Sequence, residues 1–434
     1  MPTTLPAFNA TAAIYDGECG IVSAANYAGT GRVPALDGVR AVAILWVLIH
    51  NVGSPDTGTT GVPLKIWILV LNAGWAGVQL FFALSGFLIT RILLDAKGGE
   101  GWIGHFYARR LLRIVPLYYA FLTFMLFVAP HLTVLGPLHS HDTRSSLWYW
   151  TYLVNWAAPF GGVMGTMPHV WSLAVEEQFY LAWPLLVAAW SDRMLAISCL
   201  LMTLSALFVR AAVHVMFPGE VGSAAAYELT IARWDTIALG ALVAIALRHP
   251  RVCELLARNL VRIVGAVLSL LLLLTLMQRG LPARGWLTEL VGQPLTGIAS
   301  ATLVLACVVT GGLTTRGARL QRTLVGALST APLRTIGKYS YAIYIFHSPV
   351  HRVLHEHAVQ WLNVGGGTRR LCMHIAYSAL VLAISLAFAR VSWLLLEQPF
   401  LGLKRYVPMP SASGSSGFSR GSSLLPHAVP PTLR

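Results

Sequence analysis

Apolar segments long enough to cross a lipid bilayer recur along the whole chain, and they constrain its fold more than any other feature. Only 11% of the residues are charged, whereas soluble domains have about a quarter. The apolar residues run continuously and do not alternate with polar ones, which is typical of membrane helices and not of membrane β-barrels. The sequence therefore predicts an all-α polytopic membrane protein.

A membrane-spanning helix needs about 20 predominantly apolar residues. On this basis we expect about ten transmembrane helices, near residues 34–53, 75–93, 111–131, 169–190, 194–214, 230–247, 263–278, 293–313, 338–357 and 372–396. A further stretch, "SSLWYWTYLVNW" at 145–156, is too short to cross comfortably. We expect it to form one short re-entrant or interfacial helix.

The basic residues gather in clusters that predict the orientation in the membrane. These clusters are Arg91, Lys97, Arg109, Arg110 and Arg113; Arg248, Arg251, Arg258 and Arg262; Arg316, Arg319, Arg322, Arg334 and Lys338; and Lys404 and Arg405. With ten crossings all of them fall on one side, which the positive-inside rule identifies as the cytoplasm. We therefore expect a multi-pass protein of the inner (cytoplasmic) membrane with both termini in the cytoplasm. The same rule explains the net charge of +14 better than nucleic-acid binding does.

Three regions are expected along the chain. Residues 1–33 have no basic start followed by an apolar core, so we expect a flexible cytosolic leader and no cleavable signal peptide. Residues 34–402 form the membrane domain. Residues 403–434 include a stretch rich in Ser, Gly and Pro, which predicts a disordered cytosolic tail. The five cysteines include no CxxC pair, and no Cys/His spacing suits zinc, so no metal site is expected.

The first apolar segment, "ALDGVRAVAILWVLIHN", begins and ends with ionisable residues. Such residues are costly inside a membrane and indicate function by default. Ten helical residues rise about 15 Å, so with Arg40 at the inner boundary His50 lies near the middle of the bilayer. An imidazole there can accept a proton from a hydroxyl. A histidine that is simply hydrogen-bonded to a neighbouring helix fits the position equally well.

The stretch "FYARRLLRIVPLYY" (106–119) places three arginines just before the third predicted span. Arg109 and Arg113 share a helix face, with Arg110 beside them. Guanidinium groups suit phosphate oxygens. Charge anchoring on the cytoplasmic side explains the same residues, and without other evidence it is the preferred explanation.

The stretch "MPHVWSLAVEEQFYLAWP" (167–184) is the most unusual one in the chain. His169 and Glu176 are seven residues apart and lie on nearly one helix face, with Ser172 on the same side. A carboxylate that faces an imidazole would orient it and keep it basic. The alternative is that Glu176 or Glu177 is neutralised by an arginine on another helix, with Arg233 the obvious candidate.

Further ionisable residues lie in later segments. Arg233 and Asp235 in "ARWDTIALGAL" (232–242) are two residues apart and do not face each other, so each needs a partner on another helix. His347 lies within the segment "GKYSYAIYIFHSP" (337–349). Glu397, at the end of the last span, is expected to be a structural partner for basic residues.

Taken in order, these motifs resemble the membrane acyltransferase-3 family of mostly bacterial O-acyltransferases, over residues 34–402. Six stretches carry the resemblance: "LDGVRAVAILWVLIH", "GWAGVQLFFALSGFLIT", "FYARRLLRIVPLYY", "HVWSLAVEEQFYLAWP", "IGKYSYAIYIFHSP" and "LLLEQPF". The sequence departs from the family pattern in two places. Asn51 stands where the family usually has its histidine, which is here one residue earlier, and Gln79 stands where the family often has Asp.

The resemblance implies acyl transfer, most often of acetyl, from cytosolic acyl-CoA to a hydroxyl of a carbohydrate or another small alcohol. It implies that Arg40 and His50 form a functional pair and that the arginine motif binds the CoA end. We expect His50 to act as the base, or to carry the acyl group covalently. Acyl-CoA is expected as a co-substrate, with no bound cofactor. The remaining site residues are assigned as expectations: Tyr107, Arg109, Arg110 and Arg113 to acyl-CoA; Glu176, Glu177 and Asp235 to tuning the imidazole; and His169, Trp171, Ser172, Tyr180, Arg233 and His347 to the substrate channel.

Two other functions remain open at this point. Ten helices with buried charges would equally suit a secondary transporter or a glycan flippase, which would move a solute without acyl transfer. The shifted histidine is also compatible with an inactive membrane scaffold. Dependence on acyl-CoA separates these functions from an acyltransferase.

Overall fold

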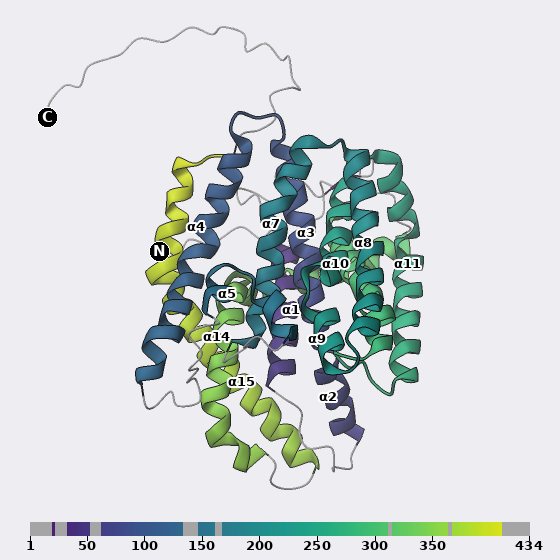
Figure 1. Cartoon of the computed structure of the whole chain (residues 1–434). Helices are drawn as coiled ribbons and strands as arrows, with labels where there is room; N and C mark the ends of the chain where they lie inside the picture. Colours follow the sequence, from purple (N-terminus) through teal and green to yellow (C-terminus); the bar gives the residue numbers. More distant parts are fainter. Residues whose placement is uncertain are drawn as a thin grey trace, which may run out of the picture.

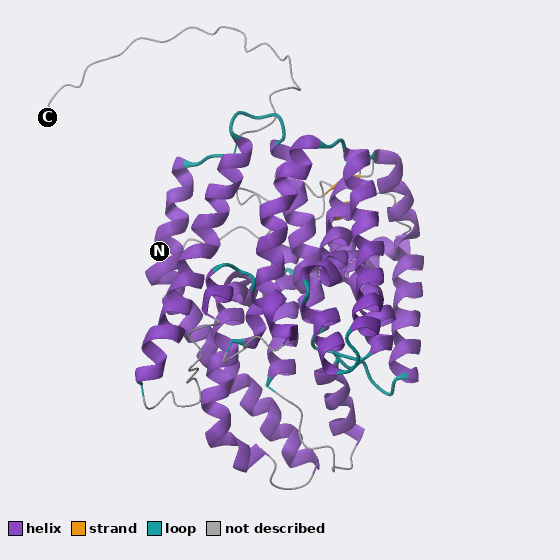
Figure 2. Ribbon diagram, in the orientation of Figure 1, coloured by secondary structure: helices purple, strands orange, loops and turns teal. Residues whose placement is uncertain are grey.

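The computed structural model describes residues 20–21, 33–52, 62–132, 146–160, 167–310, 315–362 and 367–409. These residues form a helical bundle (Figure 1), with one antiparallel pair of two-residue strands, β1 (Gly20–Ile21) and β2 (Val309–Thr310) (Figure 2). The main helices are α1 (Pro34–Asn51), α2 (Val62–Asn72), α3 (Ala76–Ala96), α4 (Trp102–Thr123), α7 (Trp171–Ala189), α8 (Asp192–Met216), α9 (Glu220–Glu228), α10 (Thr230–Ala246), α11 (Pro250–Met277), α12 (Gln293–Val308), α13 (Thr315–Leu328), α14 (Ala331–Leu362) and α15 (Gly367–Ser392).

The structure confirms the prediction of an all-α polytopic membrane protein. Seven of the described helical stretches are long and apolar enough to cross a membrane: Lys65–Ala96, Trp102–His131, Asp192–Met216, Glu220–Ala246, Pro250–Met277, Thr288–Val308 and Thr368–Tyr406. The other three predicted spans also form helices, which are α1, α7 and α14. These three carry the charged residues of the sequence motifs, which lowers their apolar character. The count of ten crossings stays a prediction.

The predicted short helix at 145–156 forms two short helices, α5 (Ser146–Trp150) and α6 (Val154–Ala157), neither of which is long enough to cross a bilayer. Tyr118 and Tyr119 of α4 hold α5, because their hydroxyls donate to the carbonyl oxygens of Tyr149 and Trp150 at 2.8 and 2.9 Å. The segment therefore packs against the bundle without adding a crossing.

The ends of the membrane domain extend into the regions expected to be a leader and a tail. Within residues 1–33 the structure describes β1 and Val33, and the rest of the predicted leader lies outside the described residues. At the other end, Leu403–Tyr406 forms a 3-10 helix. Residues 410–434, which contain most of the predicted tail, lie outside the described residues.

Glycines let α3 and α10 approach until their backbones touch. A Cβ atom on Gly86 would lie 1.9 Å from the carbonyl oxygen of Ile237, and one on Gly240 would lie 2.0 Å from that of Ala83. Small residues allow this kind of close helix crossing in membranes. The α3–α10 crossing positions Ser85, which lies one residue before Gly86, beside the cavity described below.

We expect Gly86→Ala to destabilise the protein, because the added methyl group meets backbone and not a side chain that can rotate away. Overpacking of this kind costs about 1–3 kcal/mol or more, which should lower the midpoint of thermal unfolding in detergent. Gly265→Ala in α11 is the matched control, since nothing lies within 4 Å of its added Cβ. An unchanged midpoint in Gly86→Ala would contradict the close crossing.

Candidate active site

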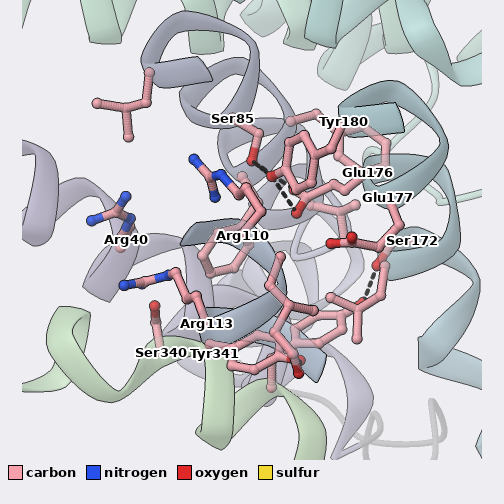
Figure 3. Close-up of a pocket in the computed structure, with 17 residues that line it drawn as sticks. Arg40, Ser85, Arg110, Arg113, Ser172, Glu176, Glu177, Tyr180, Ser340 and Tyr341 are labelled. Atoms are coloured by element: carbon pink, nitrogen blue, oxygen red, sulfur yellow. Dashed lines mark hydrogen bonds between the residues drawn. The ribbon is translucent and has the colours of Figure 1, made fainter. Parts of the chain in front are cut away.

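Three cavities follow one another along α1. The basic cavity, of about 610 Å³, opens at the end of the bundle where α3 and α4 are joined, at the top of Figure 1. The middle cavity is much smaller, at about 100 Å³ (Figure 3). The distal cavity, of about 500 Å³, lies toward the opposite end. Arg40, Arg110 and Arg113 line both of the first two cavities, and Val78 and Tyr344 line both of the last two.

The walls of the basic cavity carry most of the arginines singled out in the sequence. Arg109, Arg110 and Arg113 all line it, together with Arg40 of α1. Arg40 pairs with Asp37 at 2.8 Å. With Arg91 of α3, which also lines it, the cavity gathers five guanidinium groups from three helices, and such groups suit the recognition of phosphate oxygens.

The arginines of α4 make different side-chain contacts. Arg109 donates to the carbonyl oxygen of Val407 at 3.0 Å and so ties α4 to the segment after the last helix. Arg110 lies over the ring of Tyr180, 4.9 Å from its centroid. Tyr107, which was expected beside them, points its hydroxyl at the carbonyl oxygen of Leu181 at 2.6 Å and is not among the residues that line the cavities.

The middle cavity has a carboxylate side opposite its arginines. In Figure 3, Arg40 and Arg113 lie on one side of the cavity and Glu176 and Glu177 of α7 on the other. Glu176 accepts hydrogen bonds from the hydroxyls of Ser85 at 2.9 Å and of Tyr180 at 3.0 Å. Both carboxylates are therefore part of the route between the basic and distal cavities.

His50 lies in the last turn of α1 and lines the distal cavity. Its Nδ1 lies 2.7 Å from the carbonyl oxygen of Leu71, at the end of α2. A carbonyl oxygen can only accept, so this contact assigns the proton to Nδ1 and leaves the lone pair on Nε2. No partner for Nε2 is found among the described residues. The ring is thus held in the tautomer that a proton acceptor needs.

A glycine makes room for His50. A Cβ atom on Gly74 would lie 2.5 Å from the Cβ of His50 and 2.5 Å from the carbonyl oxygen of Trp46. Only a residue without a side chain allows the turn between α2 and α3 to approach α1 this closely. The first glycine of the motif "GWAGVQLFFALSGFLIT" therefore serves the position of the imidazole, a role that the sequence alone did not indicate.

A family model matches the part of the chain that forms most of these cavities, and several known proteins are similar to the chain. The family model for the acyltransferase domain of family 3 matches residues 33–390. The chain belongs to acyltransferase family 3. The match takes in α1 to α14, which supply most of the residues that line the three cavities, whereas Trp393, Lys404 and Met409 of the basic cavity lie beyond it.

Several curated proteins are similar to the chain over much of its length. The putative peptidoglycan O-acetyltransferase YrhL of Bacillus subtilis is 29% identical over 340 residues, which is 73% of this chain and 48% of the relative. O-acetyltransferase OatA of Staphylococcus aureus strain NCTC 8325 is 25% identical over 403 residues, which is 88% of this chain and 60% of the relative. The chain therefore spans about half the length of these relatives. No solved structure matches it significantly.

Asn51, the first departure from the family pattern, lies in a regular helix and is hydrogen-bonded to another histidine. α1 is α-helical from Pro34 to Asn51, so no bulge compensates for the shorter spacing between Arg40 and His50. The Asn51 amide donates to Nε2 of His347 at 2.8 Å, while Nδ1 of His347 donates to the carbonyl oxygen of Tyr344 at 2.7 Å. The lone pair of His347 is thus occupied, which distinguishes this imidazole from that of His50.

The second departure, Gln79, belongs to a buried polar network away from the cavities. Gln79 accepts a hydrogen bond from the hydroxyl of Thr236 at 2.7 Å. Asp235, the neighbour of Thr236, pairs with Arg210 of α8 at 2.8 Å, and both of these side chains are fully buried. Arg210 also donates to Gln293 of α12 at 3.2 Å. The network joins α3, α8, α10 and α12, and Arg210 is a member that the sequence analysis did not single out.

The residues predicted for the substrate channel are divided between the middle and distal cavities. His169 and Trp171 line the distal cavity, whereas Ser172 and Tyr180 line the middle one. Nε2 of His169 donates to the carbonyl oxygen of Ile345 at 3.1 Å.

Among the described residues no carboxylate is hydrogen-bonded to His50, so the structure does not bring Glu176, Glu177 or Asp235 to the imidazole. Arg233 lies behind the aromatic wall of the distal cavity.

The position of Asp235 leads to a testable expectation about stability. Asp235→Asn leaves the buried Arg210 guanidinium without its carboxylate, and breaking a buried pair in this way costs about 3–5 kcal/mol. We therefore expect a clearly lower midpoint of thermal unfolding in detergent. The double variant Arg210→Met with Asp235→Leu removes both charges and should recover most of this loss. A fall in kcat with no loss of thermal stability would instead indicate that Asp235 acts on the reaction.

Proposed function

We propose that this protein transfers an acyl group, acetyl in the simplest case, from cytosolic acyl-CoA to a hydroxyl of a carbohydrate at the far side of the inner membrane. The relatives named as O-acetyltransferases support this reaction. The observation that carries the proposal is the series of cavities along α1, which leads from the five arginines of the basic cavity to Nε2 of His50, an atom without a partner among the described residues.

The donor enters from the basic end, which the positive-inside rule identifies as cytoplasmic. The CoA phosphates bind the guanidinium groups of Arg109, Arg110 and Arg113 in the basic cavity. The middle cavity, with its volume of about 100 Å³, is much smaller than the other two, so in this proposal a section of the pantetheine arm passes through it while the acceptor stays in the distal cavity. Donor and acceptor therefore approach His50 from opposite ends.

The polar groups of the middle cavity serve the donor in this proposal. The pantetheine arm carries amide N–H groups that need acceptors away from water. Glu176 and Glu177 offer carboxylate oxygens along the route, and the Ser85 and Tyr180 hydroxyls fix the position of Glu176. This role replaces the earlier expectation that the two carboxylates orient the imidazole.

His50 acts as the general base. Its Nε2 takes the proton from the acceptor hydroxyl while the hydroxyl oxygen forms a bond to the thioester carbonyl carbon. The carbon–sulfur bond then breaks, and the CoA sulfur leaves as a thiolate that takes the proton from the imidazolium. The products are an ester and CoA thiol, and His50 returns to its neutral form. The Leu71 carbonyl oxygen stabilises the imidazolium through Nδ1.

The test is transfer of labelled acetyl from acetyl-CoA to cell-envelope carbohydrate in membranes that contain the protein. His50→Ala should lower the rate by about 10²- to 10⁴-fold, the usual contribution of a general base. His357→Ala is the matched control, because this exposed histidine of α14 does not line the cavities described above. Full activity in His50→Ala would eliminate the proposed base.

The same assay separates the rival functions. A transporter or flippase would move its solute without acyl-CoA, and an inactive scaffold would release no CoA at all. Mass spectrometry of cell carbohydrates with and without the protein identifies the acceptor, since each acetyl group adds about 42 daltons by elementary composition.

Binding of the donor has its own test. Arg113→Gln should raise the KM for acetyl-CoA about tenfold or more with little change in kcat, because a hydrogen bond to a charged group contributes about 1.5–3 kcal/mol. Arg193→Gln is the control, since this arginine is exposed at the start of α8 and does not line the cavities described above. An unchanged KM in Arg113→Gln would remove this arginine from the donor site.

A further inference from the structure

Two arginines line the distal cavity, at the end of the bundle opposite the basic clusters. They are Arg284, in the segment between α11 and α12, and Arg352 of α14. The positive-inside rule explains arginines at the basic end but gives no reason for arginines here. Their presence in the wall of a cavity therefore needs another explanation.

The two arginines are not fully neutralised by their surroundings. Arg284 pairs with Glu228 at 3.0 Å and lies 3.8 Å from the exposed Glu220, and among the described residues Glu228 is the only carboxylate that lines the distal cavity. Arg352 has no acidic partner among the described residues. One positive charge thus faces the cavity without a counter-charge.

Arg233 adds a third positive charge directly behind the cavity wall. Its side chain is fully buried, and none of its three guanidinium nitrogens has a hydrogen-bond partner among the described residues. It lies over the rings of Tyr227 and Trp171, 5.1 and 5.5 Å from their centroids, and both rings line the distal cavity. The nearest carboxylate along the chain, Asp235, is already paired with Arg210.

Three guanidinium groups thus lie in or directly behind the wall of the distal cavity, against one carboxylate in that wall, Glu228, and one exposed carboxylate, Glu220, outside it. In the low-dielectric interior of a membrane protein, such an imbalance strongly favours an anionic ligand. The aromatic rings of Trp75, Trp171 and Tyr227 offer apolar surfaces for the faces of sugar rings. A volume of about 500 Å³ falls within the ordinary range of small-molecule sites.

From this arrangement we infer that the distal cavity binds an acceptor sugar that carries an anionic group, a carboxylate or a phosphate, close to the hydroxyl that is acylated. Arg352 binds the anionic group directly. Arg233 favours it electrostatically through the aromatic wall. The inference rests on the proposed function, because it assigns the acceptor to the cavity that His50 lines.

The test measures binding, so that it does not depend on acyl transfer. The protein is reconstituted in nanodiscs with saturating CoA, which occupies the basic cavity. Its affinity is then compared for three matched sugars: N-acetylglucosamine, its 1-phosphate, and N-acetylmuramic acid, which differs from the first by a carboxylate-bearing ether. The two anionic sugars distinguish a phosphate from a carboxylate as the recognised group.

We expect at least one anionic sugar to bind about tenfold or more tightly than the neutral one, as a charge-assisted hydrogen bond would give. Arg352→Gln should abolish this preference, and Arg352→Lys should retain part of it. Arg279→Gln, an exposed arginine at the same end of the bundle, should leave it unchanged. His50→Ala should also retain it, because binding does not require the base.

Three results would overturn the inference: equal affinity for neutral and anionic sugars, no binding of any of them, or a preference that survives Arg352→Gln. A preference lost in Arg113→Gln but not in Arg352→Gln would assign the anion to the basic cavity and would also overturn it. Failure of the proposed function is recognised separately, as the absence of acyl-CoA-dependent transfer in the assay described above.

Discussion

Charged groups inside a membrane must be enclosed by protein, and the architecture of this bundle follows from that constraint. Arg40 and His50 lie on one helix that would be costly to expose to lipid. α1 is therefore packed against α3 and α14, with glycines at the closest approaches: a Cβ on Gly77 would lie 2.5 Å from the carbonyl oxygen of Ala43, and one on Gly337 would lie 1.9 Å from that of Asp37. The cavities run beside this shielded helix, and the most apolar helices, such as α11, face outward.

Much of this arrangement could be predicted from the sequence. The segments expected to form helices do so, because continuous apolar runs of this length have few other structures available in a membrane. The arginine motif and His50 could be selected because ionisable residues are rare in such segments. The rise of a helix gave the expected separation of Arg40 and His50, about 15 Å, and Arg40 lines the basic and middle cavities whereas His50 lines the distal one.

The partners of these residues could not be predicted, because periodicity identifies a helix face but not the helix opposite it. Asp235 faces Arg210, and His50 faces a main-chain oxygen of α2, which leaves no trace in side-chain patterns. His169 and Glu176 illustrate a second limit. Seven residues place them on nearly one face, but they also differ by about 10 Å along the helix axis, so each lies in a different cavity.

The small volume of the middle cavity bears on ion leakage across the membrane as well as on the reaction. A route that connects both faces of an energised membrane would dissipate its ion gradients if it were wide and hydrated. Here the two larger cavities are separated by about 100 Å³ of space, which Arg40, Arg110 and Arg113 line together with Glu176 and Glu177. The three guanidinium groups outnumber the two carboxylates, and a net positive charge at a constriction repels cations and protons. Under the proposed function, the bundle receives a substrate from each side while this constriction opposes the passage of ions between the two compartments.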